Sequence, residues 1–256
     1  MFAVKAAYFL STVFAMNQPP SIWLRPERSA RGPVPEHSRA EIARAAVTLA
    51  DQGGLAAVTI RSVASAIGTG PASLYRYVNT RDDILELMAD EAAGEYRYDP
   101  PVPGEVLSGL VALARQARQI YLRHPWLIDL PAVGTLPGPN AIAYIDQVLA
   151  VLNSARLDGV PLDGAAQLET VGIFTGLVRL LASTEADQRR AGQHLADWQG
   201  ALAGYLSTVV ADGRYPRLAA ALAGPAAGSA AEPPATGDLF DHTLTRILTG
   251  LLAPRL

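Results

Sequence analysis

The sequence predicts an all-α protein built from two helical domains, and three observations support this fold class. Apolar residues recur at helical spacings (i, i+3, i+4, i+7) in most segments from residue 38 onwards. No segment alternates apolar and polar residues with period two, and no β-branched run is present. Residues 98–104 (YDPPVPG) interrupt the helical pattern with prolines and a glycine, which is typical of a domain boundary. The 256 residues are sufficient for one or two hydrophobic cores.

Charge is divided unevenly along the chain. Residues 1–81 contain nine basic and four acidic residues, for a net charge of +5, whereas the remainder has a net charge of −8. A basic front and an acidic remainder are typical of a DNA-facing module joined to a domain that faces no DNA. The chain has no cysteine, which excludes disulfides, thiolate metal sites and cysteine nucleophiles. This composition is consistent with the cytoplasmic location that we expect.

Residues 1–37 show no sustained period and are expected to form a disordered, basic N-terminal arm. The apolar run from Ala6 to Met16 is too short to span a bilayer. It follows Lys5 as in a signal peptide, but no small-x-small cleavage site comes after it. We favour Met16 as the start, with the first 15 residues a start-site artefact or a tail. Residues 17–37 are interpreted as a solvated linker or as an arm that lies along DNA phosphates or in the minor groove.

Two capped helices flank the centre of the first predicted domain, which covers residues 38–96. Ser38 begins an S-x-x-E capping box for a helix over residues 38–53, which a Gly-Gly pair ends. Thr80 caps another helix over residues 80–96, where the helix dipole favours the two aspartates of the first turn.

Between these helices, residues 58–78 predict a helix, a tight turn and a short helix. The first helix covers about residues 60–67. Gly68-Thr69-Gly70 then permits the positive φ that a sharp bend requires. Pro71 opens the second helix at its first position, and we expect that helix to continue over residues 72–78. Two helices joined by a glycine-containing turn form a helix-turn-helix motif, whose second helix enters the DNA major groove. An ordinary helical corner inside a core is the alternative interpretation.

A set of residues between positions 40 and 88 carries a family pattern: Ile42, Ala45, Leu49, Gly53, Gly54, Val58, Thr59, Ile60, Val63, Ala64, Gly68, Ser73, Leu74, Tyr75, Tyr77, Val78, Arg81, Ile84 and Leu85. Through these residues, the segment 40–88 resembles the DNA-binding domain of TetR-type transcriptional repressors. Two positions depart from the family pattern: Thr69 is followed by Gly70-Pro71 where a β-branched residue is usual, and Arg81 stands where lysine is common.

The resemblance implies a recognition helix over about residues 70–77, within a motif at about 58–77. Arg76 is the residue expected to read a base, because bidentate arginine–guanine contacts supply about 1–3 kcal/mol of discrimination. An exposed arginine without such a role is the alternative. The residues expected to face the groove are Thr69, Gly70, Pro71, Ala72, Ser73 and Arg76, and those expected to contact phosphates are Thr59, Arg61, Tyr75, Tyr77 and Arg81.

Residues 97–256 are predicted to form an all-helical ligand-binding and dimerisation domain. Segments 163–183 and 237–252 are apolar on two sides, so that one side can face its own domain while the other needs a partner. They resemble the dimer-forming helix pair of the family, and the core of a single domain is the alternative. A dimer suits a near-palindromic operator in double-stranded DNA, because two recognition helices about 34 Å apart read matching half-sites. Further helices are expected at about 105–123, 139–155 and 185–211, with a short piece at 126–130 and a flexible loop at 223–237.

The resemblance also implies a pocket for a small-molecule effector, whose identity the sequence does not give. Arg179 lies within the apolar 163–183 segment and therefore needs an anionic partner, from the protein or from a ligand. Each candidate alone is equally consistent with an ordinary core or surface residue. The candidates are polar or aromatic groups among apolar helix positions: Tyr121, His124, Trp126, Tyr144, Gln167, Thr175, Arg179, His194 and Trp198.

Catalytic patterns are missing from the sequence. The four histidines lack metal-ligand spacing, no G-K-[ST] follows the Gly68 turn, and no nucleophile elbow is present. We therefore expect no enzyme activity, no cofactor, no metal and no membrane partner. The preferred interpretation is a homodimeric repressor that a small molecule releases from DNA. A ligand-independent architectural DNA-binding dimer, and a helical small-molecule-binding protein that has lost DNA reading, remain as alternatives.

Overall fold

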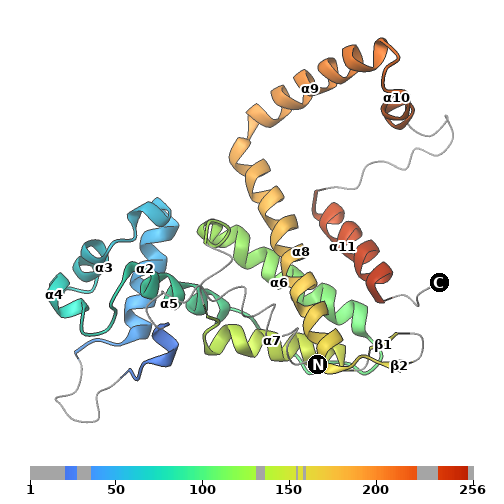
Figure 1. Ribbon diagram of the computed structural model, residues 1–256. Coiled ribbons are helices and arrows are strands. Elements are labelled where there is room, and N and C mark those ends of the chain that lie inside the picture. Colours follow the sequence, from blue (N-terminus) through green and yellow to red (C-terminus); the bar gives the residue numbers. More distant parts are fainter. Residues whose placement is uncertain are drawn as a thin grey trace.

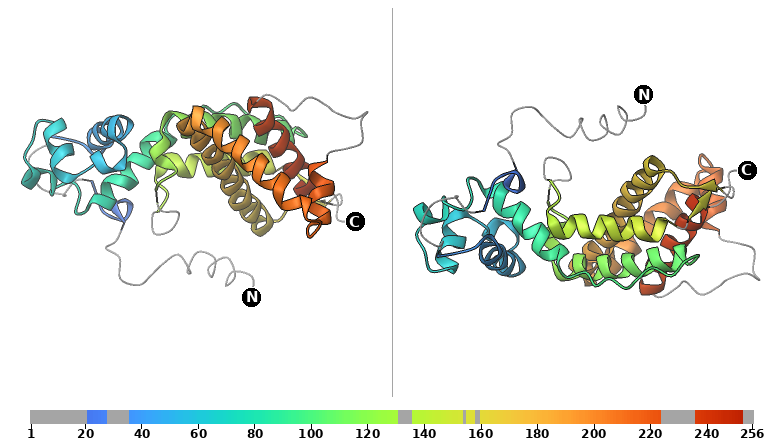
Figure 2. Two further views of the ribbon diagram at one scale, coloured as in Figure 1. Left: turned by 90° about the horizontal axis from the view of Figure 1, so that it is seen from above. Right: turned by 90° about the horizontal axis from the view of Figure 1, so that it is seen from below.

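The computed structural model describes residues 21–27, 36–130, 136–153, 155–157, 160–223 and 236–252. These residues form an elongated, all-α molecule with a small helical domain at one end and a larger one at the other (Figures 1 and 2). The helices are η1 (Ile22–Leu24), α2 (Arg39–Gly53), η2 (Leu55–Ala57), α3 (Ile60–Ala66), α4 (Pro71–Leu74), α5 (Arg81–Ala93), α6 (Val106–Arg123), η3 (Pro125–Leu127), α7 (Pro139–Leu152), α8 (Gly164–Ala191), α9 (Gln193–Ala211), α10 (Pro216–Leu222) and α11 (Thr236–Leu252).

The first domain packs α2 along α5, with α3 and α4 against them. Both long helices begin at the caps expected from the sequence. The Ser38 hydroxyl accepts a hydrogen bond from the Glu41 backbone at 3.1 Å, and Thr80 and Asp83 form a reciprocal capping box. The side chains that fill the core are fully buried: Ile42, Ala46, Val58, Val63, Leu74, Val78, Ile84 and Met88.

Helix α4 is shorter than predicted. The expected helix over residues 72–78 ends at Leu74, and residues 75–77 form a turn. The Arg76 backbone N–H donates to the Ser73 carbonyl, and that of Tyr77 donates to the Leu74 carbonyl, so the spacing of three residues tightens the end of the helix. The sequence period does not distinguish such a turn from a continued α-helix.

The second domain is a bundle of α6, α7, α8 and α11. Each helix contributes at least one fully buried side chain to a shared core; examples in chain order are Leu110, Val148, Phe174 and Leu244. Helix α8 is long and apolar enough to cross a membrane by length and composition alone. Here one side of it packs in the bundle core through Phe174, Glu185 pairs with Arg118 of α6, and the other side carries exposed apolar side chains.

Helix α8 continues further than predicted. The expected break near residue 184 is wrong: the helix runs on to Ala191, and Gly192, with φ of +51°, ends it. Beyond that glycine, α9 and α10 extend away from the bundle (Figure 1). The sequence did not predict the short helices η1 and η2, helix α10, or the antiparallel pair of β1 (Arg156–Leu157) with β2 (Val160–Pro161). Most of the loop expected at 223–237 lies outside the described residues.

Part of the expected N-terminal arm is folded. Residues 21–27 lie against α5, where the Ile22 side chain is fully buried in the first core. Arg25 forms a 2.5 Å ion pair with Asp83, and the Ser21 hydroxyl donates to Glu86 at 2.5 Å. Arg25 is thus engaged within the domain. Residues 1–20 and 28–35, which include the proposed start-site segment, lie outside the described residues.

Candidate functional site

The turn between α3 and α4 presents one face of α4 to solvent. Gly68 has φ of +74°, a left-handed conformation that glycine adopts without strain. The Thr69 backbone N–H then donates to the Ala64 carbonyl at 2.9 Å, which closes the turn. Pro71 opens α4, and buried Leu74 and Val78 hold its inner side on the core. The opposite side of α4 therefore faces outward, as a recognition helix requires.

The outer face of α4 is small at its start and aromatic and basic at its end. Gly70, Pro71 and Ala72 are exposed, as are Tyr75 and Arg76, whereas the Thr69 and Ser73 side chains are partly buried. In the described part of the chain, no hydrogen bond or ion pair engages the guanidinium group of Arg76 or that of the exposed Arg61 of α3. Their guanidinium groups are therefore available to phosphates or bases.

Other residues expected at DNA phosphates have structural contacts. Arg81 donates from Nε to the Val58 carbonyl at 2.8 Å and from a terminal nitrogen to the Leu55 carbonyl at 2.7 Å. It thereby fixes the loop before α3. The Tyr77 hydroxyl accepts from the His37 backbone N–H at 3.2 Å. Thr59 caps α3 through the Ser62 backbone N–H at 3.0 Å.

Helix α5 joins this motif to the second domain and buries three acidic residues on one stripe, Asp83, Glu86 and Asp90. Asp90 accepts a 2.9 Å hydrogen bond from the Ala141 backbone, so it caps the start of α7. Burial raises the pKa of Glu86 and that of Asp90 above their ordinary values, although both carboxyls accept hydrogen bonds. The connection between the domains is thus polar as well as apolar.

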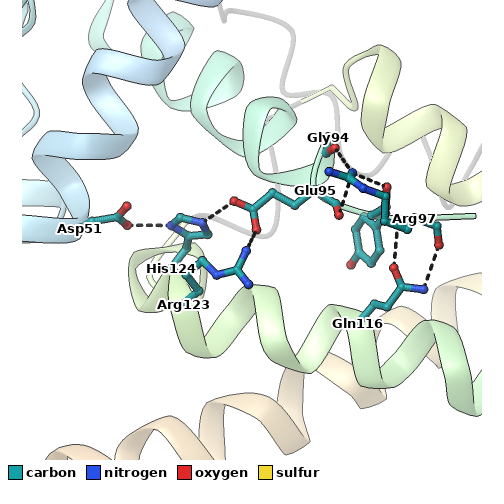
Figure 3. A network of polar contacts seen from close by, with 8 residues as sticks. Asp51, Gly94, Glu95, Arg97, Gln116, Arg123 and His124 are labelled. Atoms are coloured by element: carbon teal, nitrogen blue, oxygen red, sulfur yellow. Dashed lines mark hydrogen bonds and ion pairs between the residues drawn. The ribbon is translucent and has the colours of Figure 1, made fainter.

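A second polar connection lies at the C-terminal end of α2 (Figure 3). His124, between α6 and η3, is 4% exposed. Its ring lies between two carboxylates: Nδ1 is 2.7 Å from Asp51, and Nε2 is 3.0 Å from Glu95. Trp126 also donates from its indole nitrogen to Asp51 at 2.7 Å. The structure therefore places His124 and Trp126 at the domain junction, and not among the helices expected to enclose a ligand.

A tyrosine cluster adjoins this junction within the second domain. Tyr144 of α7 is buried and stacks on Tyr96, which follows α5, with 4.3 Å between ring centroids. Tyr98 also stacks on Tyr96, with 6.2 Å between ring centroids. Burial, together with neighbouring tyrosines, raises the pKa of Tyr96 and of Tyr144, and burial raises that of Tyr121. These phenols are therefore neutral, and their hydroxyl groups can donate hydrogen bonds to a ligand.

The remaining ligand candidates are dispersed. Arg179 approaches the cluster closely enough for its charge to favour ionisation of Tyr121, but one of its terminal nitrogens donates to the Ile128 and Leu130 carbonyls at 2.6 and 2.7 Å. Backbone carbonyls therefore accept from one nitrogen of this partly buried arginine, but they carry no charge that would balance it. Thr175 bonds the Val171 carbonyl within α8, and Gln167 bonds the Leu162 carbonyl. Trp198 is exposed on α9, and His194 lies in α9 with a side chain outside the described set.

Sequence reasoning missed the junction residues Asp51, Glu95, Tyr96 and Tyr98. The run from Glu95 to Tyr98 could have been found, because two tyrosines and two charges stand directly before the proline-rich boundary. Asp51 carried no signal, since it looks like any exposed residue near the end of a helix. A surface pocket of about 290 Å³ also lies beside Glu95, and its lining residues are Glu95, Arg97, Gln116, Gln119, Ile120 and Arg123.

Comparison with known proteins agrees with this architecture. A model of the family "Bacterial regulatory proteins, tetR family" matches residues 42–88, and one of the family "Tetracyclin repressor-like, C-terminal domain" matches residues 101–255. The HTH-type transcriptional repressor DrrR1 of Streptomyces coeruleorubidus is 32% identical over 234 residues, covering 90% of this chain and 83% of its own length. An HTH-type transcriptional regulator of Saccharopolyspora erythraea is 31% identical over 201 residues, covering 78% of this chain and 81% of its own length.

Solved structures show the same arrangement of domains. ActR from Streptomyces coelicolor, in complex with actinorhodin, superposes with a TM-score of 0.70 and 26% identity, covering 86% of this chain and 97% of ActR. Apo ActR gives a TM-score of 0.65 and 27% identity over the same shares. These matches confirm the resemblance and the all-α fold class expected from the sequence. The chain therefore belongs to the TetR family and is a helix-turn-helix, DNA-binding transcriptional regulator.

Proposed function

We propose that this regulator is a cytoplasmic, homodimeric repressor that binds a near-palindromic operator through α4 and leaves it when a small molecule occupies the second domain. The outer face of α4 carries the proposal. Tyr75 is 54% exposed and Arg76 is exposed, while Leu74 before them and Val78 after them are fully buried. An aromatic hydroxyl and an unengaged guanidinium on a rigidly anchored turn suit phosphate and base contacts.

The dimer is supported by apolar side chains that face solvent in a single chain. Helix α8 exposes Leu168, Ile173 and Leu180, and α11 exposes Ile247. Both helices also contribute to the buried core through their other sides. A second copy placed against these faces would remove the apolar surface from water, and its two-fold axis would pair the recognition helices on matching half-sites.

The effector half of the proposal is supported by the tyrosine cluster and by the relatives. ActR has been crystallised with actinorhodin and with (S)-DNPA, and DrrR1 is named a repressor. In this chain, Tyr96, Tyr121 and Tyr144 offer flat apolar faces together with neutral hydroxyl groups. This chemistry suits an effector that has an aromatic ring system and hydrogen-bond acceptors.

Helix α5 supplies a route from the effector to DNA. It leads from the turn after α4 to Glu95 and Tyr96, so a ligand that displaces Tyr96 would act directly on its end. The population would shift towards a state in which the two recognition helices no longer match the operator spacing. Only an effector that binds this state more tightly can weaken DNA binding.

A DNA-binding titration tests the proposal. The probe is a labelled duplex of the sequence upstream of the regulator's own gene, followed by fluorescence anisotropy. Replacing Arg76 with alanine should weaken binding by roughly 5- to 150-fold for each half-site, which corresponds to the loss of one bidentate base contact of about 1–3 kcal/mol per subunit. Tyr75→Phe should weaken it less, and affinity should fall steeply with added salt because phosphate contacts release counterions.

Arg115→Ala provides the control, since Arg115 is an exposed arginine paired with Asp241 in the second domain, away from α4. Wild-type affinity in Arg76→Ala and in Tyr75→Ala would contradict the assignment of the recognition helix. The effector half is tested by adding actinorhodin and related aromatic compounds to the complex. If none lowers DNA affinity, a ligand-independent architectural dimer explains the protein better.

A further inference from the structure

The ring of His124 is the buried titratable group at the domain junction that neither DNA contact nor the tyrosine cluster accounts for. Its position is fixed by the chain, because its backbone N–H donates to the Ile120 carbonyl at 2.8 Å at the end of α6. The ring extends from there towards α2 and lies between Asp51 and Glu95 (Figure 3). Each of its two nitrogens is thus within hydrogen-bond distance of a carboxylate oxygen.

This geometry determines how many protons the ring holds. A neutral imidazole has one N–H donor and one nitrogen that accepts, whereas an ionised carboxylate only accepts. A neutral His124 would therefore place a lone pair against either Asp51 or Glu95. Both carboxylates are partly open to solvent, with side-chain exposures of 34% and 30%. The contacts are all satisfied only when both ring nitrogens carry a proton.

The charges around the ring agree with this form. Arg123 pairs with the second oxygen of Glu95, and Trp126 adds a neutral donor to Asp51. Two carboxylates then face one guanidinium and one imidazolium, and the cluster is electrically balanced. With a neutral ring it would carry an excess negative charge next to a nearly buried histidine, which is costly at low effective dielectric.

The cluster joins three separate parts of the chain. Asp51 lies on α2 of the DNA-binding domain, Glu95 follows α5, and His124 and Arg123 lie at the end of α6 in the second domain. Glu95 is the direct neighbour of Tyr96, whose ring stacks on Tyr144. A displacement of Tyr96 is therefore transmitted through a single peptide unit to the carboxylate that holds the His124 ring.

We propose that His124, in its doubly protonated form, is the positioning residue that fixes the DNA-binding domain on the second domain by bridging Asp51 and Glu95. The bridge holds α2 in the orientation that binds DNA, and occupancy of the tyrosine cluster breaks it by moving Glu95. The claim that a ligand breaks the bridge rests on the proposed function, whereas the claim that His124 bridges the two domains does not. The bridge is thus either formed or broken, and both DNA binding and ligand binding at the tyrosine cluster can shift the balance between these two states, as coupling between distant sites requires.

The protonation state can be measured directly. Uniformly ¹⁵N-histidine-labelled full-length protein contains only four histidines, and the His124→Gln variant identifies the signals of His124 by their loss. At the pH of the DNA-binding measurement, both ring nitrogens of His124 should resonate in the range of protonated nitrogens. One protonated and one unprotonated nitrogen would overturn the proposal, whether or not the protein binds DNA.

The positioning role is tested with Asp51→Asn and with His124→Gln. Asp51→Asn removes the negative charge opposite the ring but retains the oxygen that accepts from both His124 and Trp126. His124→Gln can donate to only one of the two carboxylates. Each should weaken binding to the upstream duplex by about tenfold, within the usual range of coupling between sites. The double variant should be no weaker than the more affected single variant, because the same bridge is already broken. Additive losses, or wild-type affinity in Asp51→Asn, would overturn the positioning role.

Arg115→Gln serves as the matched control, since its ion pair with Asp241 lies within the second domain and should leave DNA affinity unchanged. If wild-type protein binds no operator, the proposed function fails, and a double-mutant cycle on the free energy of unfolding still decides the bridge. In that cycle, Asp51→Asn and His124→Gln should show an interaction energy. A cycle with purely additive effects would overturn the bridge independently of DNA.

Discussion

The short N-terminal helix η1 offers a sharp test of how this regulator is held together, because two neighbouring apolar residues have opposite environments. Ile22 is fully buried in the first core, and Leu24 is 69% exposed on the same turn. Ile22→Ala removes three buried carbon atoms, worth about 0.8 kcal/mol each in transfer free energy. The cavity that remains adds to this loss, so the free energy of unfolding should fall by about 2–5 kcal/mol.

Leu24→Ala is the matched control and should change the free energy of unfolding by less than about 0.5 kcal/mol. Both variants are compared with wild type by urea unfolding, monitored by circular dichroism at one protein concentration, because unfolding of an oligomer depends on concentration. The reasoning fails if Ile22→Ala is as stable as Leu24→Ala. That result would mean that residues 21–27 are a free arm in solution, as the composition of the sequence alone suggested.

Two further predictions concern assembly and pH. Leu180→Glu should convert the proposed dimer to monomers in sedimentation equilibrium, since it places a charge on a 62% exposed position of the proposed interface. Ile142→Glu, on the exposed face of α7, is the control and should leave the dimer intact. A dimeric Leu180→Glu variant would exclude α8 from the interface. Burial opposes ionisation of Glu185, but the ion pair with Arg118 outweighs burial and lowers the pKa of Glu185. The ionised Glu185 therefore stabilises the fold at neutral pH, and this stabilisation is lost as the pH falls through the lowered pKa. Burial raises the pKa of Glu86, so its ionised form opposes folding at pH 7. Glu86→Gln should therefore increase the urea midpoint at pH 7, with the gain disappearing towards acidic pH, whereas Glu185→Gln should decrease the midpoint at pH 7. Equal pH profiles of the two variants would contradict these expectations.

The features that the sequence predicted well depend on neighbours along the chain. Ser38 and Thr80 cap helices because a hydroxyl reaches backbone groups only three residues away. Gly68 adopts the predicted positive φ for an equally local reason. The family match added the order of helices, and local chemistry then explains why each begins where it does.

The features that it could not predict depend on contacts between distant residues. Arg179 looked like the natural partner of an anionic ligand, but the Ile128 and Leu130 carbonyls, about 50 residues earlier, supply its acceptors. His124 looked like a pocket residue, because nothing in its neighbourhood indicates that Asp51 lies 2.7 Å from its ring. Spacing along one helix carries no information on which element of another domain will pack beside it.

The placement of charge on α5 suggests why this helix suits a hinge between domains. Asp83, Glu86 and Asp90 lie on one buried stripe. The N-terminal segment satisfies Asp83 through Arg25 and Glu86 through Ser21, and the start of α7 satisfies Asp90 through its backbone. Apolar contacts are non-directional, so a purely apolar helix could slide or rotate in small steps at little cost. Buried carboxylates lose their hydrogen bonds when displaced, and each such loss costs about 1–3 kcal/mol or more for a charged group. A helix held in this way occupies defined positions, and a ligand that stabilises one of them can therefore change DNA affinity in a switch-like manner.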